Sequence, residues 1–94
     1  MTRYMIERTF AVGEEQMGEV GQRSKDIATE QFPEITWEHS HVVVDDAGVV
    51  RTYCVYDAPG EDSIRRHADA LGQHSVDKVA EIAGDVSPVD FPDS

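Results

Sequence analysis

The residues of this chain best suited to chemistry are two histidines, His39 and His41, which stand two positions apart. Successive residues of a β-strand point to opposite faces, so residues two apart share a face and these imidazoles would project together. Imidazole nitrogen binds nickel, zinc, copper and iron, and a carboxylate from a neighbouring strand, such as Glu7 or Glu81, would add an oxygen ligand. The pair therefore predicts a transition-metal site. The alternative is that both histidines line a partly hydrated dimer interior and bind no metal.

Other reactive side chains have simpler interpretations. His67 follows Ile64 by one helical turn on an apolar stripe, which favours a core histidine bonded to the backbone over a metal ligand. His74 follows Gly72 in a connection and is predicted to be a solvated loop residue. The single cysteine, Cys54, is predicted to be a small buried hydrophobe. The sequence contains no glycine-rich phosphate loop, serine nucleophile elbow or zinc-binding cysteine pair.

Alternating apolar and polar residues predict the strands that would position these groups. The first strand covers residues 4–10, the second residues 35–44 and the third residues 49–56. Residues 45–48, Asp-Asp-Ala-Gly, predict a hairpin connection, because glycine adopts the left-handed conformation that closes a short loop. A partly β-branched run over residues 78–86 predicts the last strand. The histidine pair therefore falls on the second strand.

Helical spacing predicts two helices, each with carboxylates in its first turn, where the helix dipole favours negative charge. The first covers residues 14–31, and the second begins after Pro59 and Gly60 and ends at Gly72. The apolar stripe of the first consists of Met17, Val20, Ser24, Ile27, Ala28 and Gln31. The stripe of the second consists of Ile64, His67, Ala68 and Leu71.

The order β-α-β-β-α-β predicts an α+β fold, a ferredoxin-like βαββαβ sandwich with a four-stranded antiparallel sheet and two helices on one face. The middle strands are apolar on both sides, with Val42 and Val44 predicted to point one way and Trp37 and Val43 the other. A sheet face in contact with water alternates more strictly. We therefore expect a homodimer in which a second copy covers the free face and closes a dimeric α/β barrel.

The length of 94 residues predicts a single domain. We expect residues 1–86 to form the ferredoxin-like domain and residues 87–94 a C-terminal tail, whose Val89 and Phe91 are available to dock on a neighbour. No apolar run approaches the ~20 residues that span a bilayer, and the first residues lack the apolar stretch of a signal peptide. One cysteine excludes an intrachain disulfide. These features predict a soluble cytoplasmic protein.

The charge balance limits the partners. Nineteen acidic residues face eight basic ones, for a formal net charge of −11. Such a surface repels nucleic acid and anionic membrane, so neither is expected as a partner. Abundant carboxylates with few lysines are also typical of proteins adapted to high salt, where screening weakens the repulsion between like charges. The alternative is an acidic protein from an ordinary salt environment.

Three stretches of the sequence carry a resemblance to known proteins. They are residues 4–10, Tyr-Met-Ile-Glu-Arg-Thr-Phe, residues 53–59, Tyr-Cys-Val-Tyr-Asp-Ala-Pro, and residues 64–68, Ile-Arg-Arg-His-Ala, which lead to Val-Asp-Lys-Val at residues 76–79. Together they resemble a family of small bacterial ferredoxin-like proteins of unknown function, one branch of which is nickel-binding. The resemblance covers roughly residues 4–86.

The nickel-binding branch suggests further site residues. Residues 37–39, Trp-Glu-His, are similar to its aromatic-Glu-His segment, and His67 and His74 stand where the branch also has histidines. Its first strand ends in a histidine pair, where this chain has Glu-Arg-Thr at residues 7–9. The resemblance implies nickel as the metal and adds Glu38 to the candidate ligands.

These observations predict a non-enzymatic protein that binds a divalent transition metal, with Ni²⁺ suggested by the resemblance, or a small ligand. The candidate metal ligands are His39, His41, Glu38, His67 and Glu7. The alternative is a cofactor-free enzyme of the dimeric ferredoxin-like barrel type, an oxygenase or isomerase. Its small organic substrate would occupy a cavity lined by aromatic residues such as Trp37 and Tyr53.

Overall fold

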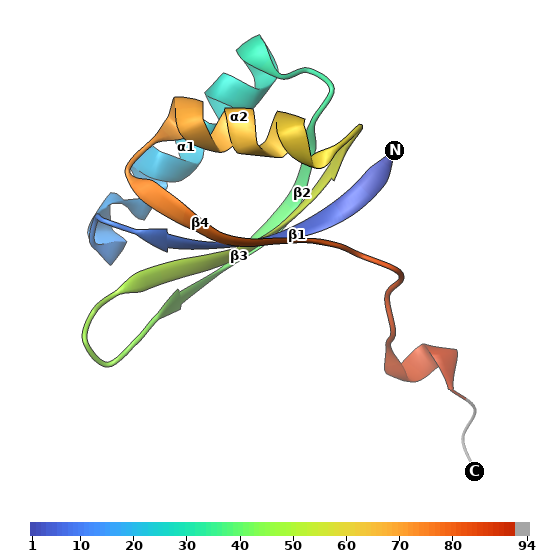
Figure 1. Cartoon of the computed structure of the whole chain (residues 1–94). Helices are drawn as coiled ribbons and strands as arrows, with labels where there is room; N and C mark the ends of the chain where they lie inside the picture. The colour runs from blue at the N-terminus through green and yellow to red at the C-terminus, as the bar shows by residue number, and fades with distance from the viewer. Residues whose placement is uncertain (92–94) are drawn as a thin grey trace.

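The computed structural model describes residues 1–91 and has the predicted ferredoxin-like α+β fold (Figure 1). A four-stranded antiparallel sheet has the order β2-β3-β1-β4. Two short 3-10 turns precede α1 and follow β4. The main elements are β1 (Thr2–Phe10), α1 (Met17–Gln31), β2 (Thr36–Val44), β3 (Val50–Ala58), α2 (Glu61–Leu71) and β4 (His74–Glu81).

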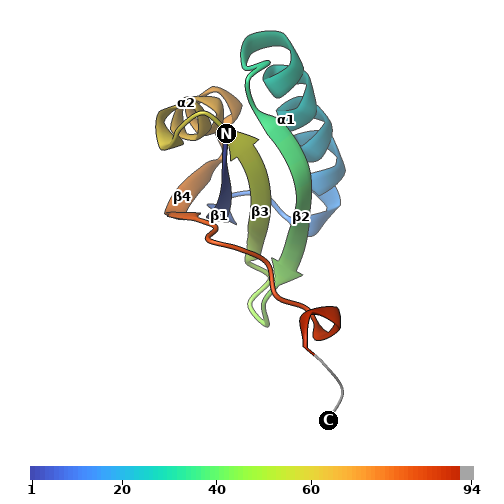
Figure 2. The same ribbon diagram turned by 90° about the vertical axis from the view of Figure 1, so that its right-hand side faces the viewer.

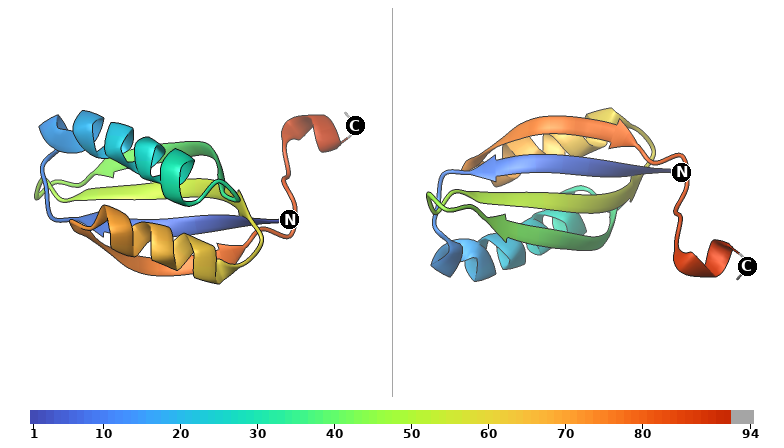
Figure 3. Two further views of the ribbon diagram at one scale, coloured as in Figure 1. Left: turned by 90° about the horizontal axis from the view of Figure 1, so that it is seen from above. Right: turned by 90° about the horizontal axis from the view of Figure 1, so that it is seen from below.

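The two sheet faces have different environments. Both helices cover one face, called here the helix face, with α1 over β2 and β3 and α2 over β1 and β4 (Figure 3, left). The other side, the open face, carries no helix (Figure 3, right). On β3, residues alternate between buried positions on the helix face, such as Cys54 and Tyr56, and half-buried positions on the open face, such as Tyr53 and Val55. The sheet therefore offers two separate surfaces on which a site can lie.

The core fills the layer between the helices and the sheet. Ile6 on β1, Val50 on β3 and Ile64 on α2 are almost completely buried. Each such side chain contributes roughly 1.5–3 kcal/mol relative to an exposed one. The predicted helical stripes are confirmed at most positions, although Gln31 of the first stripe is exposed. Cys54, with 3% of its surface exposed, is buried as predicted.

A β-bulge corrects the predicted orientation of Trp37. Trp37 pairs with Tyr56, but the next pair is His39 with Val55, so Glu38 is an extra residue in β2. An extra residue shifts the alternation by one position. Trp37 therefore lies on the helix face together with Val42 and Val44, and not on the side opposite to them as the unbroken alternation predicted.

The last strand begins and ends earlier than predicted. It covers His74–Glu81 and not residues 78–86. Its limits follow from antiparallel pairing with β1, in which His74 lies opposite Phe10 and Glu81 opposite Tyr4. Gly72 and Gln73 both have positive φ, 69° and 63°, which turns the chain directly from α2 into the strand. His74 is consequently a half-buried strand residue, and the prediction of a solvated loop residue was wrong.

The chain beyond β4 leaves the sandwich (Figure 2). The amide of Ile82 still donates a hydrogen bond to the carbonyl of Arg3 at 2.8 Å. Farther along, Val86, Val89 and Phe91 are exposed. Residues 92–94 of the predicted tail lie outside the described residues. Among residues 1–91, no helix combines the length and the apolar character needed to cross a membrane.

Candidate functional site

His39 and His41 lie side by side on the open face. Their ring centroids are 5.3 Å apart with an interplanar angle of 79°, and both residues are exposed. The register places His39 opposite Val55 and His41 opposite Tyr53 on the neighbouring strand β3. The bulge ends just before His39, so the predicted two-residue spacing on one face holds for this pair. Two imidazoles at this separation have the chemistry of a metal-binding pair.

Glu7 lies on the same face but two strands from the histidine pair. It pairs with Tyr53 on β3 and with Lys78 on β4. Neighbouring strands are about 4.8 Å apart, so the backbones of Glu7 and His41 are separated by about 10 Å. Glu7 and the histidines therefore share a surface without being neighbours.

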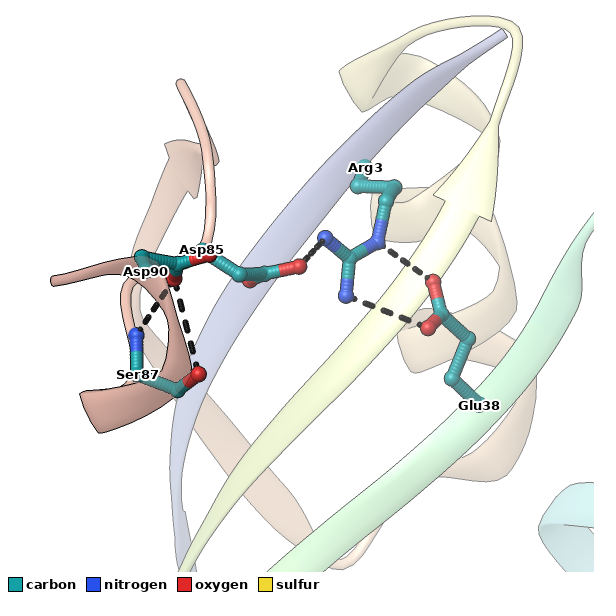
Figure 4. A network of polar contacts seen from close by, with 5 residues as sticks. All are labelled: Arg3, Glu38, Asp85, Ser87 and Asp90. Carbon is teal, nitrogen blue, oxygen red and sulfur yellow. Dashed lines mark hydrogen bonds and ion pairs between the residues drawn. The ribbon is translucent and has the colours of Figure 1, made fainter. Parts of the chain in front are cut away.

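Glu38 is engaged by Arg3. The guanidinium donates from Nε to Oε2 at 2.7 Å and from Nη2 to Oε1 at 3.1 Å, and Nη1 donates to Asp85 at 2.5 Å (Figure 4). The hydrogen bonds from Arg3 lower the pKa of the Glu38 carboxyl and keep it ionised. They also direct this carboxylate toward Arg3 on β1, although Glu38 directly precedes His39 in the chain.

His67 lies on the opposite side of the sheet from the histidine pair. It is 1% exposed, and its Nε2 donates to the carbonyl of Ser24 at 3.0 Å. Burial lowers the pKa of His67, and the nearby charge of Arg8 adds to this effect, so the ring is neutral near pH 7. The structure confirms the core position. The five predicted ligands are therefore not brought together, because one of them lies behind the sheet.

His74 is also neutral and packed in the structure. Its ring stacks on Phe10 with centroids 4.9 Å apart, and its Nδ1 donates to the carbonyl of Gly72 at 2.7 Å. Burial lowers the pKa of His74 as well. Within residues 1–91, no group of three or more histidine, cysteine or carboxylate side chains is arranged to hold a metal ion.

A buried arginine forms a second candidate site, which sequence reasoning missed. Arg8 is 2% exposed on the helix face, where its Nη1 donates to Tyr56 Oη at 3.4 Å and its guanidinium lies 5.3 Å from the centre of the Tyr56 ring. The signal was present in the sequence, because Arg8 falls between Ile6 and Phe10 in the alternation of the first strand. Strand periodicity alone places it among the buried residues.

Arg8 lines a cavity of about 210 Å³ between α1 and the sheet. The wall from α1 includes Val20, Gly21 and Ser24, and the wall from β2 includes Trp37 and Val42. The surface of this cavity is largely apolar, with hydroxyl groups of serine, threonine and tyrosine as further polar groups. An apolar cavity with a few polar groups is typical of a small-molecule site.

Comparison with known protein families assigns the chain. A family model described as "Nickel responsive protein SCO4226-like" matches residues 4–82. The chain belongs to the SCO4226-like family. The resemblance to a small bacterial ferredoxin-like family with a nickel-binding branch is thereby confirmed at the level of the family. No curated protein matches the chain.

The solved structure of SCO4226, the protein whose name the family carries, supports the fold. The crystal structure of SCO4226 from Streptomyces coelicolor A3(2) superposes with a TM-score of 0.66 and 16% sequence identity. The match covers 89% of this chain and 99% of SCO4226. At this identity the likeness establishes a shared fold, while the residues of this chain must supply the argument for its chemistry.

Proposed function

We propose that this protein binds a divalent transition metal, with nickel as the first candidate, through His39 and His41 on the open face. The observation that carries the proposal is the exposed imidazole pair, with ring centroids 5.3 Å apart on one strand. Imidazole suits nickel, zinc and copper, and the description of the family names nickel responsiveness. The predicted Glu38 would support the pair from its ion pair with Arg3, and His67 would have no part in the site.

A second copy would complete the site. Two imidazoles leave most of the coordination positions of a divalent transition metal unfilled. A two-fold axis through the open face would bring a second His39–His41 pair to the same ion, for four imidazoles in total. The open face also exposes apolar side chains that a partner copy would cover, including Met5 at 39% and Val43 at 46% exposure. Metal binding and dimer formation would then strengthen each other.

Titration calorimetry with Ni²⁺ and with Zn²⁺ on untagged protein tests this proposal. The parent should bind one ion per two chains, and the His39→Ala/His41→Ala double variant should bind at least about tenfold more weakly, since it loses both imidazoles. His67→Gln is the matched control and should bind like the parent. Binding should also weaken in acid, because a ligating imidazole must be neutral.

Two results would contradict the proposal. One is a double variant that binds nickel as well as the parent while His67→Gln loses binding, which would move the site to the helix face. The other is a parent that binds neither metal below millimolar concentration. In that case membership of the family does not bring metal binding to this chain.

A further inference from the structure

Arg8 is a buried cation for which the described chain supplies no counter-ion. Arg3, Arg51, Arg65 and Arg66 each form an ion pair with a carboxylate, and none of the ion pairs within residues 1–91 involves Arg8. An isolated charge is costly to remove from water, by several kcal/mol even after relaxation. This arrangement occurs in a chain with nineteen acidic residues, where carboxylate partners are abundant. The absence of a pairing carboxylate at Arg8 among residues 1–91 therefore favours a partner from beyond the described residues.

The polar atoms of Arg8 without partners have the geometry of a carboxylate fork. Its Nε and Nη2 are buried and make no hydrogen bond to any residue that the structure describes. These two nitrogens lie on one edge of the guanidinium, and their N–H bonds match the two oxygens of a carboxylate. Arg3 uses the same two nitrogens, Nε and Nη2, to hold both oxygens of Glu38 (Figure 4). The corresponding edge of Arg8 is thus suited to the same acceptor.

The cavity beside Arg8 fits an apolar body attached to such an acceptor. Its volume of about 210 Å³ exceeds the roughly 150 Å³ of a cavity that takes up benzene. Tyr56 places a hydroxyl group beside the guanidinium, and Ser24 adds another to the cavity wall. Burial raises the pKa of Tyr56, so its phenol keeps the proton and remains a donor. The apolar wall is formed by side chains that include Phe10, Val20, Trp37, Val42 and Leu71.

We propose that this cavity binds a small organic acid, whose carboxylate pairs with Nε and Nη2 of Arg8 and whose apolar body lies along the wall between α1 and β2. A buried water molecule is the competing occupant, because buried waters bond otherwise unsatisfied polar groups, and His67 Nδ1 and His74 Nε2 are also buried without a partner among the described residues. Water satisfies hydrogen bonds and leaves the charge of Arg8 uncompensated. A carboxylate accepts hydrogen bonds from Nε and Nη2 and also compensates the charge, but it offers no donor to the two histidine nitrogens. The site lies behind the sheet from His39 and His41, so it is independent of the proposed metal.

Calorimetric titration of metal-free protein with benzoate and hexanoate, and with the neutral analogues benzamide and 1-hexanol, tests the proposal. Both acids should bind with dissociation constants below about 1 mM, and the neutral analogues at least about tenfold more weakly, because they lose a charge-assisted bidentate pair. Arg8→Met should abolish the preference for acids over neutral analogues. Arg65→Met, which removes an exposed arginine, should retain it. Equal binding of acids and neutral analogues would overturn the proposal.

A second pair of variants tests the cavity without changing any charge. Gly21 lines the cavity, and a Cβ at this position meets no atom within 4 Å, so Gly21→Leu should fold and fill the space. Gly18→Leu is the matched control, because a Cβ there also meets nothing within 4 Å and Gly18 does not line the cavity. Gly21→Leu should weaken benzoate binding at least about tenfold, and Gly18→Leu should leave it unchanged. Unchanged benzoate binding in Gly21→Leu would show that the acid binds elsewhere.

Discussion

Arg3 on β1 and Glu38 on β2 are joined by two hydrogen bonds, of 2.7 and 3.1 Å, although β3 lies between their strands. The ion pair crosses the open face at the bulge, where Glu38 is the extra residue. It holds the bulged segment in place directly before His39. The contact therefore links the start of β1 to the segment that positions the histidine pair.

The Arg3–Glu38 pair should stabilise the protein in a pH-dependent way. Glu38→Gln should lower the melting temperature by a few degrees near pH 7, because it removes the charged partner of Arg3. The pKa of Glu38 is lowered in the folded state, so its contribution is fully present above the unfolded-state pKa of about 4.3 and is lost as pH falls through the lower folded-state value. The difference between parent and variant should accordingly shrink in acid, as measured by thermal unfolding at several pH values.

Glu30→Gln provides a control for this measurement, since Glu30 is an exposed residue of α1. It removes one negative charge without touching the bulge. If Glu38→Gln and Glu30→Gln have the same effect at every pH, the ion pair adds nothing to stability beyond the general charge.

The protein should be a dimer that depends on the open face. Val55 is half-buried on this face, between Met5 on β1 and His39 on β2 in the register. Val55→Asp should weaken dimerisation at least about tenfold, because a two-fold interface would bury two like charges together. Light scattering at tens of micromolar should show the parent as a dimer and the variant as a monomer with an intact far-UV spectrum.

Ala47→Asp adds the same charge in the exposed hairpin loop and should remain dimeric. A parent that is monomeric at tens of micromolar, in dilute and in concentrated salt, would exclude the dimer.

Stability should rise with salt concentration. A net charge of −11 on 94 residues produces repulsion between surface carboxylates, and at ~0.1 M salt the Debye length is ~10 Å, comparable with their spacing. Raising potassium chloride from dilute buffer to molar concentration should therefore raise the melting temperature by several degrees. Sodium sulfate is not a suitable substitute, because it also strengthens apolar burial. A flat melting temperature would argue against adaptation to high salt.

The two packed histidines should make the protein less stable in mild acid. The pKa values of His67 and His74 are lowered by burial in the folded state, whereas the unfolded chain titrates near 6.5. The unfolded state then binds more protons below pH 6.5, so stability falls as pH falls through 6.5 toward the folded-state values. The positive charge of Arg8 also lowers the pKa of both histidines.

The melting temperatures of the metal-free parent and of the His67→Gln/His74→Gln variant should therefore depend differently on pH. Thermal unfolding between pH 7 and pH 5 should show a falling melting temperature in the parent and a flatter profile in the variant. Arg65→Met, an exposed substitution on α2 that keeps both histidines and lies away from the open face, serves as the control and should keep the pH dependence of the parent. Parallel profiles of the parent and the His67→Gln/His74→Gln variant would contradict the prediction.

Local pattern was sufficient for the order of elements and for much of the burial. Alternation in residues 49–56 correctly separated Tyr53 and Val55 from Cys54 and Tyr56, because a regular strand has a strict period of two. The same alternation placed His39 and His41 on a common face, and helical spacing placed His67 in the core. These features depend on neighbours in the chain, so the sequence determined them by itself.

Features that depend on partners distant in the chain were decided by the tertiary structure. The bulge at Glu38, which moved Trp37 to the helix face, accompanies a contact with Arg3, thirty-five positions away. The limits of β4 follow from its pairing with β1. The cavity beside Arg8 exists because α1 lies over β2 and β3, and no local pattern fixes how closely a helix packs on a sheet. The alternation of the first strand contains the signal that Arg8 is buried, and only the assembled layers showed that its Nε and Nη2 have no partner among the described residues.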